Sequence, residues 1–419
     1  MLRLLDVRRG DPRPEPASAG LSPEVVEAAR GICERVRREG DRALVELTLR
    51  HDGADVEGRL EVVPEELQAA SPPAEVARAI DGMAVRLRDL HARQLPRPWS
   101  AEAGGLRFGE VVLPLRSVGC YAPGGLAAYP STVLMTAIPA RVAGVERVVL
   151  CTPPAEDGTV SESVRYAARV AGVDAVYRIG GAQAIAAMAY GTETIERVDK
   201  VVGPGNEYVT AAKHEVGAVV GIDMLAGPTE LVIVAGASAD PAVLAVDLVA
   251  QAEHDPQART TLIALDESLP DRVERSLEAE VEKSTRREIV EASLAASSVV
   301  VVRDEAQAAD IADALAPEHL QVITDDPRGF LDRVRAFGAA FLGSRTAVTL
   351  GDYGAGSNHV LPTMTTARFQ SGLRATDFVT ARSVVEASPE AAAALGPEVE
   401  AIARAEGLDG HARASEVRR

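Results

Sequence analysis

The sequence predicts an α/β protein with parallel sheets that are covered by helices on both faces. From residue 111 onward, short runs rich in β-branched residues alternate with alanine-rich stretches of helical character, and this alternation is typical of βαβ units. Two such blocks follow one another, at roughly residues 120–230 and 230–345. A chain of 419 residues, 47% hydrophobic and 25% charged, is long enough for two to three domains with cores of their own.

The first hundred residues are predicted to be mostly helical. Residues 23–39 and 73–95 carry apolar side chains at helical spacing, mixed with arginine and glutamate. The strands that follow are short and apolar, as expected for strands buried on both faces of a sheet. They are predicted at residues 147–150, 174–179, 230–234, 260–265, 299–302 and 320–323. The helices between them are predicted at residues 161–170, 182–190, 241–254, 305–315 and 327–337.

The regular alternation stops after residue 350. Residues 351–363 are glycine-rich and polar, and they are predicted to form a loop. Residues 389–414 have an alanine and glutamate pattern typical of a helix, with too few apolar residues to fold alone.

Composition excludes several classes of function. Lysine and arginine number 44 and aspartate and glutamate 62, so the net charge is 44 − 62 = −18, which disfavours binding to nucleic acid or to an anionic membrane surface. Aromatic residues make up only 3%, too few for base-stacking platforms. The longest uncharged stretch, between Ser117 and Arg141, is broken by Pro123 and Pro130 and is therefore not predicted to span a membrane.

The cysteines indicate a reducing compartment. Cys33, Cys120 and Cys151 are odd in number and widely spaced, and they form no CxxC motif. A disulfide framework and a thiolate zinc site are therefore excluded. The N-terminus lacks an apolar segment of signal-peptide length, so we expect a cytoplasmic protein.

Two short motifs combine histidine with neighbours suited to catalysis, although a single histidine is more often a surface or core side chain. Gln251 and His254 lie three residues apart near the end of a predicted helix, so both could reach one zinc-like ion. The HExxH motif of zinc proteases is absent. Glu318 and His319 lie at a helix-to-strand corner, and a carboxylate beside an imidazole suits proton transfer. A solvated helix end and an exposed polar turn are the alternatives.

Two further histidines lie in less regular segments. The loop at residues 351–363 contains Asp352, which could complete a metal site, and His359; an ordinary surface loop is the alternative. Glu406 and His411 lie near the C-terminus, where side chains are usually frayed. They would matter only if the tail docks on a folded surface.

Three glycine-rich turns could bind a dinucleotide. They lie at residues 119–125, 179–183 and 202–206, and two of them follow a predicted strand and open a helix, where free N–H groups favour phosphate. None has the GxGxxG pattern, and no acidic ribose ligand is evident at the expected spacing. By pattern alone, they indicate an incomplete nucleotide-binding fold or ordinary tight turns.

Taken together, these segments resemble the histidinol dehydrogenase family over nearly the whole chain. The most specific stretch is residues 221–230, Gly-Ile-Asp-Met-Leu-Ala-Gly-Pro-Thr-Glu, followed at family spacing by residues 251–255, Gln-Ala-Glu-His-Asp. Further family-like segments lie at residues 36–44, 121–125, 202–206, 317–319, 358–363 and 406–408.

The resemblance implies a zinc-dependent homodimer that uses NAD to oxidise L-histidinol, through L-histidinaldehyde, to L-histidine, the last steps of histidine biosynthesis. It implies one zinc ion per subunit and two incomplete Rossmann-like domains with helical N- and C-terminal extensions. Residues 21–120 and 230–375 would form the first domain, with most catalytic residues, and residues 121–229 the NAD-binding domain. Residues 1–20 would be an extension, and residues 376–419 a helical tail that crosses to the partner subunit.

The resemblance also implies roles for individual residues. His319 would be the acid/base, and Glu318 would activate the water that hydrates the aldehyde. The implied zinc ligands are Gln251, His254, Asp352 and His411. The implied NAD contacts are Tyr121, Gln183 and Asn206. The implied substrate contacts are Thr229, Gln251, His254, Glu318, Asp352, His359, Glu406 and His411.

Some positions depart from the family pattern. Val348 lies in an Ala-Val-Thr run where Ser-Glu-Ala is usual, and Met364 and Thr365 replace a pair of glycines. Thr380 takes the place of a lysine, and Ser357 that of a proline. These positions flank the site and leave every implied ligand in place.

The departures keep two alternatives open. The chain could be a dehydrogenase of the same family that oxidises another amino alcohol or diol. Glu406 and His359 favour histidinol, because a carboxylate beside a metal suits a cationic, nitrogen-rich substrate. A zinc hydrolase, in which Glu318 or His319 activates metal-bound water, is the second alternative.

Overall fold

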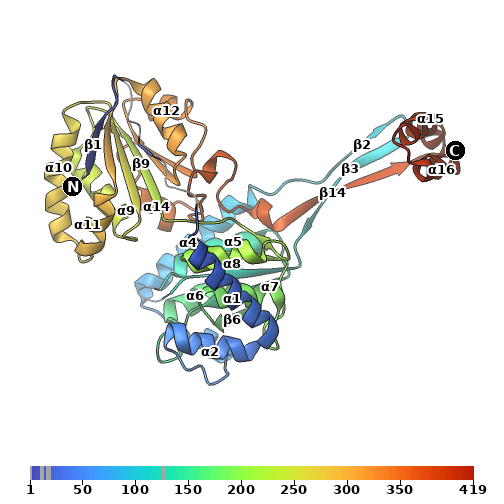
Figure 1. Ribbon diagram of the computed structural model, residues 1–419, viewed down its shortest axis with the longest axis horizontal. Helices are drawn as coiled ribbons and strands as arrows, with labels where there is room; N and C mark the ends of the chain where they lie inside the picture. The colour runs from blue at the N-terminus through green and yellow to red at the C-terminus, as the bar shows by residue number, and fades with distance from the viewer. Residues whose placement is uncertain (1, 10–13, 16–19, 125–127) are drawn as a thin grey trace.

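The computed structural model describes residues 2–9, 14–15, 20–124 and 128–419. Figure 1 shows two lobes and a long arm that projects away from both of them and carries the C-terminus. Gly125, which belongs to one of the predicted glycine-rich turns, lies outside the described residues, as does part of the predicted N-terminal extension at residues 1–20.

One lobe is built on a five-stranded parallel sheet. In spatial order its strands are β6 (Ala175–Arg178), β5 (Arg147–Thr152), β4 (Ser117–Tyr121), β7 (Lys200–Val202) and β8 (Gly221–Ile222). The chain runs outward from β4 to β6 and then returns to the other side of β4. This reversal between β4 and β7 is a topological switch point, where α/β sheets open a crevice at the carboxyl ends of the strands.

Helices cover both faces of this sheet. Helices α5 (Pro130–Val142) and α6 (Glu162–Ala171) pack on one face, and α7 (Gly181–Tyr190) and α8 (Glu207–Val216) on the other. The N-terminal helices complete the two layers. They are α1 (Pro23–Glu39), α2 (Asp41–Asp52), α3 (Pro64–Ala69) and α4 (Ala74–Ala92).

The packing of these N-terminal helices corrects the predicted domain division. We expected residues 21–120 to join residues 230–375, but α1 packs against α7 and α8, and α4 packs against α5. β4 is also the central strand of this lobe, not part of the other one. Apolar periodicity predicts which face of a helix is buried, but it does not specify which sheet covers that face.

The second lobe is built on a six-stranded parallel sheet. Its strands in spatial order are β1 (Arg3–Asp6), β11 (Ser298–Val301), β10 (Arg259–Ala264), β9 (Glu230–Ala235), β12 (His319–Ile323) and β13 (Ala339–Leu342). Helices α9 (Pro241–Ala252), α10 (Leu269–Lys283) and α11 (Arg287–Ala295) cover one face. Helices α12 (Glu305–Leu315) and α13 (Pro327–Leu331) cover the other. The N-terminal extension therefore contributes an edge strand, where we expected a helix.

The segment after β13 holds short helices that frame the site. They are α14 (Val348–Tyr353) and the 3₁₀ helices η1 (Thr366–Arg368) and η2 (Ala375–Phe378). The prediction of a loop over residues 351–363 is therefore wrong for its first three residues, which end α14.

The arm is a three-stranded antiparallel sheet that the sequence did not predict. It consists of β2 (Trp99–Ala103), β3 (Leu106–Pro114) and β14 (Val379–Ala387), with β3 in the middle. Beyond β14 the chain forms α15 (Pro389–Ala405) and α16 (Asp409–Glu416) at the far end of the arm (Figure 1). The helical pattern of residues 389–414 is thus confirmed, but the tail begins with a nine-residue strand.

Two expectations about the chain's environment can be compared with the structure. Cys33, Cys120 and Cys151 are free thiols buried in the core, as expected for a chain without a disulfide framework. Within the described ranges, every helix is too short or too polar to cross a bilayer.

Candidate active site

A chain of hydrogen bonds joins the starts of two neighbouring strands in the six-stranded sheet. Thr229 precedes β9 and Glu318 precedes β12, and these strands pair side by side at the switch point of the sheet. The Thr229 hydroxyl donates to Oε2 of Glu318 at 2.5 Å, and the Glu230 backbone N–H donates to the same oxygen at 3.0 Å. The Gln251 amide donates in turn to the Thr229 hydroxyl at 2.5 Å. The carboxylate is therefore fixed between the two strands.

Burial gives Glu318 the proton affinity of a base that works near neutral pH. Its residue exposure is 7%, and burial raises the pKa of its carboxyl to about 7, although the hydrogen bonds from Thr229 and Glu230 act in the opposite direction. A carboxylate with this pKa can accept a proton from water or from a substrate hydroxyl at neutral pH.

His319 is held as a neutral imidazole with one free nitrogen. Its Nδ1 lies 3.2 Å from the Glu230 carbonyl oxygen; a carbonyl can only accept, so Nδ1 carries the proton. Nε2 is buried and has no hydrogen-bond partner among the described residues. Burial also lowers the pKa of the ring. The lone pair on Nε2 is therefore free to accept a proton from a bound molecule.

The end of α9 presents two groups that could hold a cation. Nδ1 of His254 donates to the Ala250 carbonyl oxygen at 3.0 Å, which leaves Nε2 as the available nitrogen. The Gln251 side chain uses its N–H group on Thr229, so its carbonyl oxygen remains available. Both side chains lie one turn apart, as the i, i+3 spacing predicted.

Asp352 and His359 approach this cluster from the segment around α14. Burial raises the pKa of Asp352, while the nearby His319 and His254 lower it. Burial lowers the pKa of His359 to about 4, with a further contribution from His319. Nε2 of His359 lies 3.3 Å from the Thr132 hydroxyl at the start of α5. His359 thus links the catalytic lobe to the other lobe.

The structure gathers seven of the predicted site residues and separates two. The seven that lie together are Thr229, Gln251, His254, Glu318, His319, Asp352 and His359. Glu406 and His411 are exposed residues of the tail, at the far end of the arm. Accordingly, the part of the chain that the structure describes contains no group of three or more His, Cys, Asp or Glu side chains able to hold a metal ion.

Glu230 is a buried carboxyl that the sequence reasoning did not single out as part of the site. It lies at the first position of β9, and burial raises its pKa to about 7. Its carboxylate accepts from the backbone N–H of Met364 at 2.9 Å, and so fixes the segment after His359 against the catalytic strands. A glutamate that begins an otherwise apolar run was the available signal.

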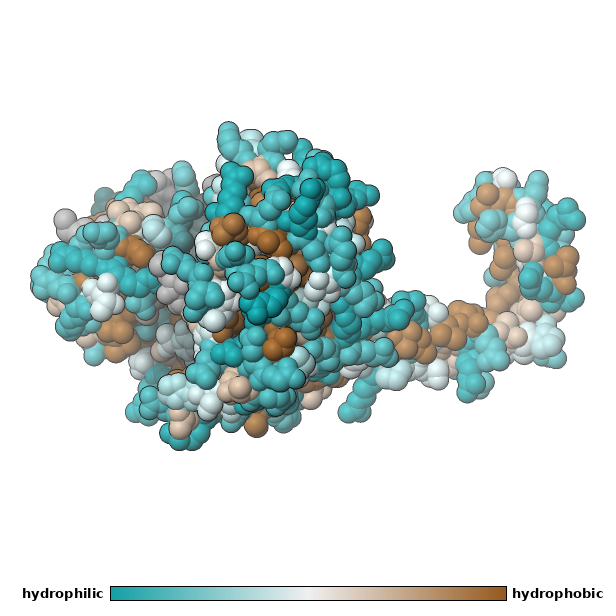
Figure 2. Space-filling model, turned by 90° about the horizontal axis from the view of Figure 1, so that it is seen from below, coloured by the Kyte–Doolittle hydropathy of each residue, from teal (hydrophilic) through white to brown (hydrophobic). Residues whose placement is uncertain are grey.

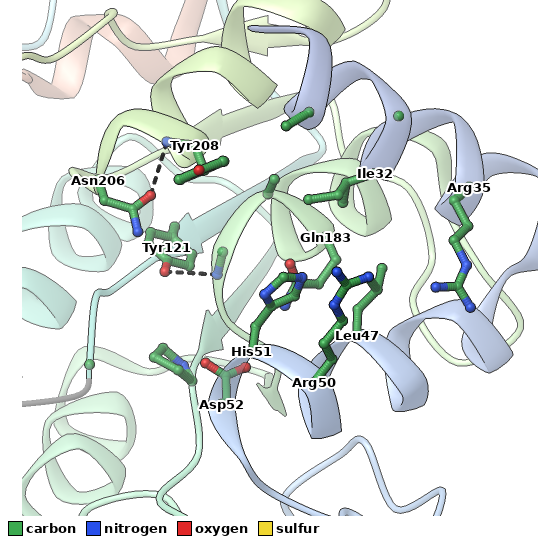
Figure 3. Close-up of a pocket in the computed structure, with 16 residues that line it drawn as sticks. Ile32, Arg35, Leu47, Arg50, His51, Asp52, Tyr121, Gln183, Asn206 and Tyr208 are labelled. Carbon is green, nitrogen blue, oxygen red and sulfur yellow. Dashed lines mark hydrogen bonds between the residues drawn. The ribbon is translucent and has the colours of Figure 1, made fainter. Parts of the chain in front are cut away.

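The predicted NAD contacts line a cavity of about 710 Å³ in the other lobe. Tyr121, Gln183 and Asn206 come from three segments at the carboxyl ends of the sheet strands, and Figure 3 shows them around one space. The Tyr121 hydroxyl accepts from the Gly181 N–H at 3.0 Å. The Asn206 side chain caps α8 by accepting from the N–H groups of Tyr208 and Val209, both at 3.1 Å.

The opposite wall of this cavity was not predicted. Helices α1 and α2 close it, and they bring Arg35, Arg50, His51 and Asp52 to its surface (Figure 3). The sequence could not indicate this wall, because apolar periodicity does not specify which sheet α1 and α2 cover.

A buried ion pair holds the turn that precedes Asn206. Nζ of Lys213 donates to the Gly203 carbonyl oxygen at 2.5 Å and to Oδ1 of Asp223 at 2.6 Å. The other oxygen of Asp223 accepts from the Gly203 N–H at 2.7 Å. The side chains of Lys213 and Asp223 are 2% and 0% exposed. One buried ion pair therefore holds both the backbone N–H and the carbonyl oxygen of Gly203.

The fold and the two sites define a two-lobed α/β enzyme, with acid–base groups in one lobe and a large cavity in the other. Comparison with known proteins specifies the family. The family model "Histidinol dehydrogenase" matches residues 17–419. The chain is 46% identical to the histidinol dehydrogenase of Caulobacter vibrioides, covering 99% of this chain and 95% of that one, and 48% identical to that of Cereibacter sphaeroides, covering 93% and 91%.

A solved structure agrees with the sequence comparison. The crystal structure of histidinol dehydrogenase from Elizabethkingia anophelis is 32% identical, superposes with a TM-score of 0.93, and covers 100% of this chain and 98% of its own. The chain therefore belongs to the histidinol dehydrogenase family and is an oxidoreductase. The predicted family is confirmed, and the family assignment favours a dehydrogenase over the zinc hydrolase alternative.

Removal of the Lys213 ammonium should destabilise this lobe strongly. Lys213→Met leaves the buried Asp223 carboxylate without its counter-charge, which we expect to cost about 3–5 kcal/mol in the free energy of unfolding. Urea unfolding followed by circular dichroism measures this change. Lys283→Met is the control, because Lys283 is 69% exposed in its pair with Glu280 and should cost no more than about 1 kcal/mol. Equal losses in the two variants would contradict the prediction.

Proposed function

We propose that this enzyme oxidises L-histidinol, through L-histidinaldehyde, to L-histidine in the cytoplasm, with two molecules of NAD as the hydride acceptors. The observation that carries the proposal is the adjacent Glu318 and His319: a carboxyl with a pKa of about 7 beside an imidazole whose Nε2 has no partner among the described residues. A four-electron oxidation of an alcohol to a carboxylic acid needs both a base for the alcohol and a base for water.

The residues present fit NAD, and they supply part of a zinc site. The cavity of about 710 Å³ suits a nucleotide, and Nε2 of Gln183, buried in its wall, has no hydrogen-bond partner within the described ranges. Nε2 of His254 and the Asp352 carboxylate are donors of the kind zinc prefers, and the Gln251 carbonyl adds a neutral oxygen beside them. When bound, NAD would supply a hydride acceptor and zinc a Lewis acid.

Two side chains of the protein would then move the protons in the two oxidations. Nε2 of His319 takes the hydroxyl proton of the alcohol as the hydride leaves carbon, which gives the aldehyde. Glu318 takes a proton from the water that adds to the aldehyde carbon, while Nε2 of His319 returns its proton to the carbonyl oxygen, which gives the hydrate and leaves Nε2 free again. His319 takes a hydroxyl proton of the hydrate as the second hydride leaves, and the acid results. Thr229 and the Glu230 N–H hold Glu318 in place throughout.

The exposed arm supports a homodimer with shared active sites. Apolar side chains along the arm and tail face solvent in the single chain, and Figure 2 shows apolar surface along the arm. They include Trp99 (50% exposed), Val385 (69%), Ile402 (62%) and Val417 (76%). Exposed apolar surface of this kind marks an interaction site, and a two-fold axis would let each tail dock on the other subunit. Glu406 and His411 would then complete the substrate and zinc sites of the partner.

A single observation favours the second candidate, a related amino alcohol or diol as substrate. Met364, at a position where the family pattern has glycine, lies against Gly227 so closely that a Cβ there would be 2.6 Å from its sulfur. Met364 and Thr365 adopt positive φ angles of 52° and 62°. A methionine side chain therefore fills space beside the segment that leads to Thr229.

The proposed reaction is tested by NADH formation. The purified enzyme with zinc and NAD should reduce two NAD per L-histidinol, and L-histidine should appear in equal amount to the histidinol consumed. The specificity constant for histidinol should exceed those for other amino alcohols and diols at least tenfold. A larger value for another alcohol would establish the second candidate, and hydrolysis without NADH would contradict both.

Glu318→Gln should separate the two half-reactions. The change keeps the shape but removes the base, so we expect oxidation of histidinaldehyde to fall roughly 10²–10⁴-fold and oxidation of histidinol to fall less. In the parent enzyme the aldehyde step should accelerate as the pH rises through about 7, where the carboxyl ionises, and the variant should lose this rise. His319→Asn is the contrasting variant, which should slow both steps. Equal losses in both steps for Glu318→Gln would assign it a structural role.

Shared sites predict complementation between two inactive variants. His254→Asn and His411→Asn should each lose zinc and activity. After subunit exchange, each mixed dimer has one site with both histidines intact, so an equal mixture should recover about a quarter of the parental activity. The control mixes His411→Asn with a His254→Asn/His411→Asn double variant, which can form no intact site. Absence of recovery after verified exchange would place His411 in the site of its own subunit.

A further inference from the structure

Asp52 brings an unpartnered carboxylate to the cavity that we assign to NAD. It is the last residue of α2 and lines the cavity, and Figure 3 shows its carboxylate facing the same space as His51. Its Oδ2 is buried and has no hydrogen-bond partner in the described part of the chain. Both of its oxygens lie beside the start of α7, 3.1 and 3.3 Å from where a Cβ on Gly180 would be.

Gln183 supplies an unpartnered donor near this acceptor. Its exposure is 2%, and its Nε2 has no partner in the described part of the chain. Its carbonyl oxygen lies 2.9 Å from where a Cβ on Gly181 would be, so Asp52 and Gln183 flank consecutive residues at the start of α7. Buried polar atoms without partners are costly. An acceptor and a donor at one cavity wall match sugar hydroxyls, each of which donates and accepts one hydrogen bond.

No acidic residue directly follows the second strand, where a dinucleotide-binding fold usually places the acid that binds ribose. That acid normally follows the second strand of the unit, and in this sheet the second strand, β5, ends at Thr152 and is followed by Pro153. Pro153 instead lies against Gly180, with its Cβ 2.7 Å from the Cβ position there. Asp52 reaches the same neighbourhood from α2, outside the βαβ unit.

We propose that Asp52 is the specificity-determining residue for the cofactor, binding the hydroxyls of the adenosine ribose and excluding a 2′-phosphate. The proposal rests on the proposed function, in which NAD is the oxidant. In Figure 1, α2 lies at the end of its lobe away from the catalytic lobe, so the adenosine half of the dinucleotide, not the nicotinamide, meets this wall. A carboxylate donates no hydrogen bond to a phosphate and repels its charge.

The arginines of this wall indicate what the loss of Asp52 would allow. Arg35 is engaged by Glu39 and Glu46, whereas Arg50 lines the cavity two residues from Asp52. Once Asp52 is neutral, Arg50 can hold a 2′-phosphate without an opposing carboxylate nearby. Asp52→Asn should therefore gain affinity for NADP as well as lose affinity for NAD.

Isothermal titration of the full-length enzyme, without substrate, tests the proposal. The probes are NAD, NADP, 5′-AMP and adenosine 2′,5′-bisphosphate. The parent should bind NAD and 5′-AMP and discriminate against both 2′-phosphorylated probes. In Asp52→Asn we expect NAD and 5′-AMP to bind roughly 10–100-fold more weakly, as for the loss of a hydrogen bond to a charged group, and the preference for NAD over NADP to fall by at least tenfold. The ratio of kcat/KM for the two cofactors should change in parallel.

A matched control and a folding check keep the result unambiguous. Glu156→Gln removes an equal charge near the same loop, since Cγ of Glu156 lies 3.8 Å from the Cβ position of Gly53, but Glu156 is exposed and does not line the cavity. It should leave both affinities unchanged. An unchanged NAD/NADP ratio in a folded Asp52→Asn variant, or weaker binding of NAD with unchanged binding of 5′-AMP, would overturn the proposal. Failure of the parent to bind or reduce NAD would instead overturn the proposed function.

Discussion

The hydrogen bonds that hold the Glu318 carboxylate are the interaction on which the catalytic lobe depends. They join β9 to β12 at the switch point of the six-stranded sheet, and the same two strands position His319 through the Glu230 carbonyl. A buried carboxylate would be unstable in a core without donors. Two donors from one strand and its preceding residue stabilise it while burial keeps its proton affinity high, and so the site retains a base that a solvent-exposed glutamate could not provide.

The two lobes use opposite edges of their sheets. In the five-stranded sheet the cavity lies at the carboxyl ends of the strands, as the switch-point rule predicts. In the six-stranded sheet Thr229 and Glu318 precede their strands, and α9 delivers Gln251 and His254 from its C-terminal end, so this site lies at the amino edge. The hydrogen-bond contact between His359 and Thr132 links the two lobes. In the proposed reaction, the substrate would lie in one lobe and NAD in the other, so this contact would help to hold the two sites together.

Much of the fold could be predicted from local pattern, and the failures have physical reasons. Strands such as β9 and β12 are buried on both faces and are therefore visible as apolar runs, and α1 matches its predicted bounds. The strands of the arm were not predicted. β2, for example, is exposed at all five positions, so it lacks the alternation of apolar and polar residues that indicates a half-buried strand. The site residues came from family-like motifs. Asp52 lies outside these motifs and Glu230 is only the last residue of one, so only tertiary packing shows that they face a cavity or the strands of the site.

Three of the nine buried side-chain atoms that lack a partner in the described part of the chain connect stability to function. Asp52 Oδ2, Gln183 Nε2 and His319 Nε2 all belong to the two sites, and each lacks a hydrogen bond that folding would normally supply. Each such atom costs about 1–3 kcal/mol, so the free enzyme carries this cost until bound molecules supply the missing partners. These costs fall on the cavity wall and on the His319 imidazole, whereas both oxygens of Asp223 and Oε2 of Glu318 accept hydrogen bonds within the protein. At Asp52, Gln183 and His319, a bound molecule can supply the hydrogen bond that the chain lacks, and this gain favours binding at these positions.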